Sequence, residues 1–428
     1  MELFVFLGSL FGFLITGLPI AIVLIICSII LLHYIEMYDP MLLAHQMISG
    51  TDNYVLVTVP FFILAGELMK HGGISKQLIT FAELVVGRFR GGMGYVTVLA
   101  CMLFAGLSGI AIADVSALGS ILIPMMVAIG YRKDRATGLV CSAALTAPII
   151  PPSLPMIILG VTVELSIGRL FVMGIVPGIL LGFTVMSAWF IMVRRDGYHD
   201  VKTVSLNQVW PIFIKAFPSL MLPVIIIVGI RLGFFTPTEG GAIACVYAFF
   251  VAVIINRELK LHRLPAILYD GIKSSAAVMF IVGGACTIGW LITMADVPAQ
   301  LIERMQGLVQ HPMLLLIVLN ILFLLLGMVM DITPIILIFA PVIFPLIRSA
   351  GIDPYYFALV MIINLCIGLI TPPVGTVLFV GCSVSNLKMG EVVKGILPFL
   401  LAELIFLVAC ISFPRIITWP ATWFGYNY

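Results

Sequence analysis

The chain has 428 residues, of which 62% are apolar and 10% charged, with a net charge of +2. Soluble domains are about half apolar and about a quarter charged, so this composition excludes a soluble globular protein. The apolar residues form many runs of about 20, each long enough to cross a ~30 Å hydrocarbon core. Because lipid leaves no partner for free backbone groups, the sequence predicts an all-α polytopic membrane protein.

The first segment, 1–90, is predicted to hold scaffold spans and an arm. Residues 1–32 form one apolar run with neither a basic start nor an Ala-x-Ala site. We therefore interpret this run as the first span and not as a cleaved signal peptide. A second apolar run covers 55–68, and a shorter, half-inserted one covers 74–86.

The second segment, 91–177, is predicted to hold a re-entrant hairpin and a broken helix. Two apolar arms, 93–104 and 110–128, are joined by Gly106-Leu-Ser-Gly109 and flanked by basic residues at both ends. By the positive-inside rule, this hairpin enters and leaves on the cytoplasmic side. The span that follows, 136–159, is interrupted at Pro148-Ile-Ile-Pro-Pro-Ser153, where three prolines remove helical hydrogen bonds.

The third segment, 178–311, is predicted to connect the two halves by scaffold spans and a second arm. The fourth, 312–398, repeats the pattern with a hairpin around Gly327-Met-Val-Met-Asp331-Ile-Thr333-Pro334 and a helix broken at Thr371-Pro-Pro-Val-Gly375. The fifth, 399–428, holds the rest of the final span and an aromatic tail suited to a membrane interface.

One ungapped offset of 221 residues relates the second and fourth segments. Eight Gly or Pro identities share this offset: Gly106 and Gly327, Pro124 and Pro345, Gly130 and Gly351, Pro151 and Pro372, Pro152 and Pro373, Gly160 and Gly381, Gly174 and Gly395, and Pro177 and Pro398. Gly and Pro determine backbone shape, so the two segments are expected to share one backbone fold and not only a similar composition. Chance identity in a chain rich in both residues is the alternative. A repeat broken at matching places is typical of transporters whose site lies between the copies.

The basic residues predict how the chain crosses the membrane. With the N-terminus outside, the inner segments hold 15 Lys and Arg: Arg88, Arg90, Arg132, Lys133, Arg135, Arg194, Arg195, Lys202, Lys215, Arg257, Lys260, Arg263, Lys273, Lys388 and Lys394. The outer segments hold seven: Lys70, Lys76, Arg169, Arg231, Arg304, Arg348 and Arg415. This bias makes the two hairpins enter from opposite sides, as inverted repeats do.

The two hairpin tips and the two helix breaks supply oxygen ligands suited to a hard cation such as Na⁺. One predicted set consists of Ser108, Gly109, Thr146 and Ser153, and its counterpart of Asp331, Thr333, Thr371 and Thr376. Half-helix ends at such breaks also attract ions, with anions favoured at N-termini. The alternative is that these hydroxyls bond back to their own helices and only support packing.

Two carboxylates stand inside apolar stretches, where a charge costs a few kcal/mol and is usually paired or functional. Asp114, on the returning arm of the first hairpin, either balances a cation or bonds to backbone across the hairpin. Asp331 lies at the second tip, and we expect it to be functional. The sequence holds no Walker A, HExxH or GxSxG motif, so we expect no enzyme and no cofactor beyond Na⁺.

Five motifs together resemble the large membrane subunit of tripartite ATP-independent periplasmic (TRAP) transporters, the DctM type. They are Phe104-Ala-Gly-Leu-Ser-Gly109 with Ala113-Asp114, Pro148–Ser153, Phe235-Thr-Pro-Thr-Glu-Gly-Gly-Ala242, Gly327–Pro334 and Gly368-Leu-Ile-Thr-Pro-Pro-Val-Gly375. The resemblance covers nearly the whole chain. The two glycines after Glu239 are a mild departure, because alanines usually follow there.

The resemblance implies an elevator-type fold of the ion-transporter superfamily and Na⁺-driven import of small organic acids, such as C4-dicarboxylates, sugar acids or sialic acid. It implies a periplasmic binding protein of the DctP type and a four-helix membrane subunit of the DctQ type as partners. Since the chain begins at the first span, the small subunit is expected to be a separate polypeptide. The implied location is the bacterial inner membrane.

The resemblance also implies residue roles. Na⁺ sites would fall on Gly106, Ser108 and Gly109 with Thr146, Pro148 and Ser153, and on Gly327 and Asp331 with Thr371, Gly375 and Thr376. Substrate would lie between the tips, against Ser108, Asp114, Pro152, Thr333 and Pro373. The alternatives are a stand-alone Na⁺/dicarboxylate symporter that needs no binding protein, and an ion channel or structural subunit.

Overall fold

The computed structural model describes residues 2–37, 39–198 and 206–423, and all regular elements in these residues are helical. Eight helices in this part of the chain are long and apolar enough to cross a membrane. The chain is therefore a multi-pass membrane protein, as its composition predicts. Residues 199–205 of the polar connection and 424–428 of the aromatic tail lie outside the described residues.

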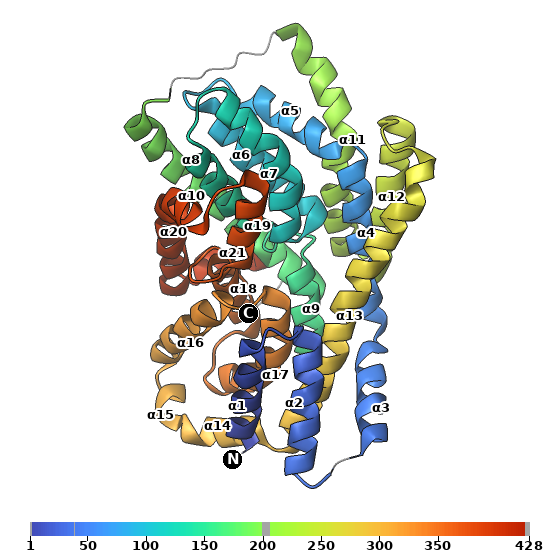
Figure 1. The fold of residues 1–428 in the computed structure, drawn as a ribbon, viewed down its shortest axis with the longest axis vertical. Helices are drawn as coiled ribbons and strands as arrows, with labels where there is room; N and C mark the ends of the chain where they lie inside the picture. Colours follow the sequence, from blue (N-terminus) through green and yellow to red (C-terminus); the bar gives the residue numbers. More distant parts are fainter. Residues whose placement is uncertain (1, 38, 199–205, 424–428) are drawn as a thin grey trace.

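The apolar run at the start of the chain forms two helices, α1 (Glu2–Ile15) and α2 (Ile20–Tyr34), which pack side by side (Figure 1). The chain reverses at Gly17, whose φ is +77°, and Pro19 precedes α2 without an amide hydrogen to donate. The prediction of a single span over 1–32 was wrong because run length alone does not reveal a short turn, here residues 16–19.

The next helices are α3 (Pro40–Thr51), a short 3₁₀ turn η1 (Tyr54–Val57), α4 (Thr58–His71) and α5 (Ile74–Val86). The bounds of α5 agree with the predicted 74–86 run. At the junction of α4 and α5, the Asn256 side-chain amide donates to the Gly72 carbonyl at 2.9 Å. Lys76 lines a cavity of about 380 Å³ together with Lys215 and Glu258.

These contacts place residues 70–76 on the side of the molecule that holds residues 215 and 256–258. Lys70 and Lys76 therefore lie on the same side as Lys215 and Arg257 and not across the membrane from them as predicted, because the chain turns once more before them than predicted, between α1 and α2. Moving both to the inner side changes the count from 15 to 15 + 2 = 17 inner and from seven to 7 − 2 = 5 outer. The corrected count strengthens the positive-inside bias.

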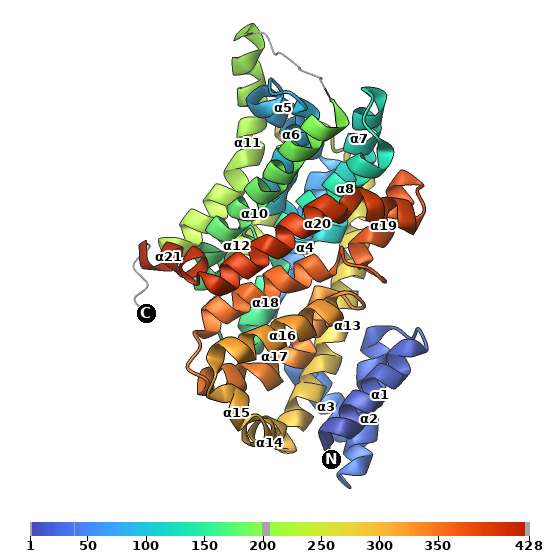
Figure 2. The same ribbon diagram turned by 90° about the vertical axis from the view of Figure 1, so that its left-hand side faces the viewer.

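Two helical hairpins form where they were predicted. The first joins α6 (Gly92–Ser108) to α7 (Ala111–Ala128), and the second joins α16 (Pro312–Gly327) to α17 (Ile332–Ser349). Figures 1 and 2 show that the open ends of the two hairpins point toward opposite ends of the long axis of the molecule. Helix α5 lies near the open end of the first hairpin, and the short helices α14 (Val297–Arg304) and α15 (Gln306–Val309) lie near that of the second.

Each hairpin is followed by a broken helix. The first break separates α8 (Lys133–Ala143) and η2 (Ala144–Thr146) from α9 (Leu154–Thr162). The second separates α18 (Pro354–Gly368) from α19 (Thr376–Ser385). Both breaks fall on the Pro-Pro motifs that were expected to interrupt the helices.

The remaining helical elements complete the fold: α10 (Ile167–Asp196), α11 (Leu206–Arg231), α12 (Pro237–Phe250) with the π-helical turn η3 (Val251–Ile255), the 3₁₀ turn η4 (Leu261–Arg263), α13 (Leu264–Met294), α20 (Met389–Ser412) and α21 (Arg415–Trp423). The part of the chain that the structure describes thus ends in α21, which packs against α10. In Figure 1, α13 runs beside α2, α3 and α4, and the packing contacts agree.

The 221-residue offset also holds for helix boundaries. Adding it to 111–128, the bounds of α7, gives 332–349, the bounds of α17. Adding it to 133, the first residue of α8, gives 354, the first residue of α18. The offset further maps α2, 20–34, onto 241–255, inside α12 and η3. The repeat therefore relates most of the two halves and extends beyond the segments that the Gly and Pro identities mark.

Helices α8 and α20 pack closely because a glycine on each lies at their contact. A Cβ added at Gly395 would lie 2.1 Å from the Asp134 carbonyl oxygen, and one added at Gly138 would lie 2.7 Å from the Gly395 carbonyl carbon. Arg135 reinforces the contact by donating to the Gly395 carbonyl at 3.1 Å. Such close packing holds part of the first half against part of the second.

We predict that Gly395→Ala destabilises the protein, because its Cβ meets backbone that cannot move without separating α8 from α20. Overpacking of this kind costs about 1–3 kcal/mol, which the midpoint of thermal unfolding in detergent would report. Gly390→Ala on the same helix is the control, since a Cβ there has open space around it. Equal midpoints for the two variants would contradict the close contact.

Candidate functional site

The first hairpin tip is shorter than predicted. Gly106 and Ser108 belong to the last turn of α6, and the turn itself consists of Gly109 and Ile110. Gly109 has a φ of +64°, and a Cβ there would lie 2.8 Å from the Pro152 carbonyl oxygen. Glycine at this position thus permits both the left-handed backbone and the close approach of the tip to the first break.

A side-chain hydrogen bond closes this tip. The Ser108 hydroxyl donates to Asp114 Oδ1, and Asp114 is fully buried in the first turn of α7. The bond closes the hairpin through a side chain, whereas one of the two predicted alternatives had Asp114 bonded to backbone across the hairpin. Asp114 Oδ2 is buried and has no hydrogen-bond partner among the described residues, so it remains an available acceptor.

The hydroxyls at the first break bond within their own segment. Thr146 donates to the Ala143 carbonyl at 2.7 Å, and Ser153 donates to the Pro148 carbonyl at 2.5 Å. Ser153 Oγ also accepts from the Met156 amide at 3.3 Å, which caps α9. In this structure, therefore, both side chains stabilise the broken backbone, which was the alternative to cation binding.

The second tip packs against the second break. The Gly375 amide, on the broken helix, donates to the Met328 carbonyl of the tip at 2.9 Å. Gly327 and Gly368 lie against each other, so that a Cβ added at Gly368 would lie 2.6 Å from the Gly327 Cα. These contacts satisfy backbone that the break frees, as membrane depth requires.

The polar side chains at the second tip and the second break differ in their hydrogen bonds. Thr371 donates to the Ile367 carbonyl at 2.7 Å, a bond to its own helix. The buried Thr376 hydroxyl has no partner in the part of the chain that the structure describes. Asp331 occupies the N-cap position of α17, where its carboxylate makes no side-chain capping bond but interacts with the Ile332 amide at the start of the helix.

A cavity of about 160 Å³ lies where the two tips meet. Both tips and the first break line it, together with α13 and the end of α18: Gly109, Ile110, Ala111, Ile112, Pro148, Leu154, Pro155, Val278, Asp331, Ile332, Thr333 and Leu369. Of the predicted site residues, the structure brings Gly109, Pro148, Asp331 and Thr333 to this cavity. The others do not line it: Gly106, Ser108, Asp114, Thr146, Pro152, Ser153, Gly327, Thr371, Pro373, Gly375 and Thr376.

Three helix N-termini converge on this cavity. The first residues of α7, α9 and α17 are Ala111, Leu154 and Ile332, and all three line it. The first amides of a helix have no intrahelical partner, and the helix dipole places partial positive charge there. The cavity therefore combines an environment that favours an anion with the Asp331 carboxylate, which favours a cation.

Two larger cavities lie between the tips and one end of the molecule. One, of about 440 Å³, is lined by Asp52, Asn53, Trp290, Thr293 and Leu337, among other residues. Compared with the cavity between the tips, its lining residues on α13 and α17 lie one or more turns further along each helix. It therefore lies further from the tips, toward the C-terminal ends of α13 and α17.

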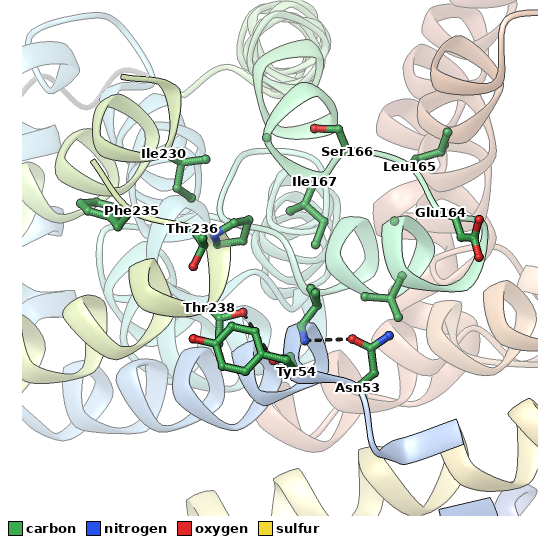
Figure 3. A pocket seen from close by; sticks show the side chains of 15 residues that line it. Asn53, Tyr54, Glu164, Leu165, Ser166, Ile167, Ile230, Phe235, Thr236 and Thr238 are labelled. Atoms are coloured by element: carbon green, nitrogen blue, oxygen red, sulfur yellow. Dashed lines mark hydrogen bonds between the residues drawn. The ribbon is translucent and has the colours of Figure 1, made fainter. Parts of the chain in front are cut away.

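The second of these cavities, of about 580 Å³, is shown in Figure 3. It lies between η1, the connection from α9 to α10 and the turn before α12, and it shares Asn53 with the previous cavity. Thr236 and Glu239 form a capping box at this turn, with the Thr236 amide donating to Glu239 Oε2 at 2.7 Å. Glu239 therefore fixes this turn as a helix cap.

Several polar groups in the helix core were missed by the sequence analysis. Asn364 donates to both the carbonyl and the side-chain oxygen of Asn320, joining α18 to α16. Glu403 is fully buried in α20 and accepts a hydrogen bond from Ser142 of α8. Glu403 lies in an apolar run, so the rule that singled out the carboxylates Asp114 and Asp331 would have found it too.

Comparison with known proteins gives a consistent result. The family model described as "Tripartite ATP-independent periplasmic transporter, DctM component" matches residues 7–416. The chain is 44% identical to the 2,3-diketo-L-gulonate TRAP transporter large permease protein YiaN of Escherichia coli, covering 99% of this chain and all of the relative.

Two further relatives differ in the acid that their names state. The chain is 39% identical to the C4-dicarboxylate TRAP transporter large permease protein DctM of Pseudomonas aeruginosa, over 90% of each chain. It is 34% identical to the sialic acid TRAP transporter large permease protein SiaM of Vibrio cholerae, over 98% of this chain and 99% of the relative.

We predict that Gly109→Ala lowers stability more than Gly130→Ala. Both glycines have positive φ, but only at Gly109 does an added Cβ also meet backbone. The difference in unfolding midpoint thus isolates the contact between the first tip and the first break from the backbone strain that both share. A larger loss at Gly130 would show that this contact is weak.

Proposed function

The chain belongs to the DctM component family of tripartite ATP-independent periplasmic transporters, a family of transporter permeases and not of enzymes, and we propose that it imports a small organic acid together with Na⁺. The observation that carries this proposal is the convergence of three helix N-termini and the Asp331 carboxylate on one cavity. The substrate carboxylate would lie against the first turns of α7, α9 and α17.

Na⁺ would bind close to this anion. Asp331 offers a carboxylate at the cavity between the tips, and Thr376, at the adjacent break, offers a buried hydroxyl without a partner among the described residues. At the first hairpin tip, Asp114 Oδ2 is the corresponding acceptor without a partner among the described residues, and the hydrogen bond from Ser108 holds this carboxylate in place. A bound Na⁺ lowers the cost of moving a carboxylate through a medium of low dielectric constant.

The two outer cavities support a route for the substrate. The cavity of about 440 Å³ lies along α13 and α17 beyond the tips, and the cavity of about 580 Å³ shares Asn53 and Val161 with it, at the end that the corrected charge count assigns to the outside. In the proposed cycle the two repeat cores, 91–177 and 312–398, move as an elevator against the scaffold helices. Substrate enters through the outer cavities and leaves on the cytoplasmic side.

The proposed partners and location follow from the tripartite family. A periplasmic binding protein of the DctP type would deliver the acid, and a four-helix membrane subunit of the DctQ type would accompany this chain in the bacterial inner membrane. The names of the relatives favour diketogulonate, C4-dicarboxylates and sialic acid as candidate substrates. All three are small anions that suit a site built from helix N-termini.

We predict that Asp331→Asn lowers Na⁺-dependent uptake at least about tenfold, because loss of a ligand charge weakens metal binding by about this factor or more. Uptake of radiolabelled acid into proteoliposomes across a Na⁺ gradient would measure it. Asp270→Asn is the control, since Asp270 is exposed on α13 and does not line the cavity. Unchanged uptake in Asp331→Asn would remove Asp331 from the cation site.

The stand-alone symporter alternative has a direct test. We predict that the chain co-purifies with a small four-helix subunit when both are expressed, and that proteoliposomes import the acid only when the binding protein is added. Uptake by this chain alone at an equal rate would assign it to the stand-alone class. Current in the absence of substrate would indicate a channel.

A further inference from the structure

Glu403 is a buried acid in the last crossing helix that the proposed transport site does not use. It is fully buried on α20, and 403 − 389 = 14 residues separate it from the start of that helix. At about 1.5 Å per residue, this places Glu403 about 21 Å along the helix, near the middle of a ~30 Å hydrocarbon core. A carboxylate at this depth is normally paired or functional.

The carboxyl group has one hydrogen-bond donor. Ser142 Oγ, near the end of α8, donates to Glu403 Oε1 at 2.5 Å. Oε2 is buried and has no partner among the described residues, and no Lys or Arg in that part of the chain forms an ion pair with this group. An ionised carboxylate with one donor and no counter-charge would be strongly disfavoured here.

The surroundings supply no positive charge at this depth. The ionisable groups on the helices packed against α20 are Lys133, Asp134, Arg135 and Cys141 of α8, Arg169, Arg194, Arg195 and Asp196 of α10, Tyr355, Tyr356 and Cys366 of α18, Cys382 of α19 and Arg415 of α21. The basic side chains among them lie in the first or last turns of their helices. The thiols of Cys141 and Cys366 on these helices bring no positive charge.

The same surroundings do not suit Na⁺. A hard cation needs several oxygen ligands, whereas among the described residues this carboxyl group has one polar partner, the Ser142 hydroxyl. We propose that Glu403 is a proton-binding site that holds its carboxyl group as the neutral acid and joins α20 to α8 through Ser142. The bound ligand is a proton, and the site is separate from the cavity between the tips.

The proton on Glu403 would affect the first helix break, because Ser142 lies close to that break. Ser142 lies two residues before η2, the turn that leads into the first break, so the hydrogen bond from Ser142 fixes the approach to that break. Loss of the proton would leave an unpaired charge between α8 and α20 and would separate them. Stability should therefore fall as pH rises, because the folded state binds one proton more than the unfolded state over that range.

The test compares wild type with Glu403→Gln, which has nearly the shape and polarity of the neutral acid. We expect Glu403→Gln to keep Na⁺-driven uptake within about twofold of wild type, as isosteric changes in a core do. We also expect it to remove the fall in unfolding midpoint between neutral and alkaline pH that wild type shows. Glu391→Gln, at the exposed start of the same helix, is the control and should keep that fall.

A second measurement works whether or not a variant transports. The infrared difference spectrum of wild type minus Glu403→Gln at neutral pH should show the C=O stretch of a protonated, buried carboxylic acid. This band is present in wild type and absent in Glu403→Gln. If instead Glu403→Gln raises the Na⁺ concentration for half-maximal uptake at least about tenfold, Glu403 is a cation ligand and the proposal is wrong. Absence of the acid band in wild type would also overturn it. Because these readouts concern Glu403, they are distinguishable from a failure of the site at Asp331.

Discussion

The structure depends on how backbone groups freed by two helix breaks are satisfied inside a membrane. Lipid offers no hydrogen bonds, so each break must be covered by protein or face a wet cavity. The chain covers each break with a hairpin tip from the same half. Gly109 lies against Pro152 at the first break, and the Gly375 amide donates to Met328 at the second. Glycine makes this approach possible, since any side chain would separate tip from break.

The same arrangement creates the site. Because each tip and each break exposes helix ends, bringing the tips together collects N-terminal amides around one cavity without a basic side chain lining it. Amides fixed in a folded backbone need no reorganisation to bind an anion, and they impose little shape of their own. This fits a family whose members are named for acids as different as C4-dicarboxylates and sialic acid. Specificity for one acid would then depend on the residues around the amides and on the binding protein proposed to deliver the acid.

Much of this could be predicted from Gly and Pro positions, because these residues limit backbone shape directly. Both hairpins, both breaks and the 221-residue repeat were found in this way, with boundaries within a few residues. The turn at Gly17 was missed because apolar content does not separate one long span from two short helices. The roles of single hydroxyls could not be predicted, since whether Ser153 bonds to Pro148 or to an ion depends on local distances. Glu403 was missed although its position in an apolar run was visible.

The most direct test is a cryo-electron microscopy map of the chain with its partner subunit, Na⁺ and the transported acid. The account predicts density for the acid between Gly109–Ile112 and Asp331–Thr333, with its carboxylate toward the first turns of α7, α9 and α17 and an ion beside Asp331. Density for the acid only in the cavities around Asn53, with the region between the tips closed, would contradict it.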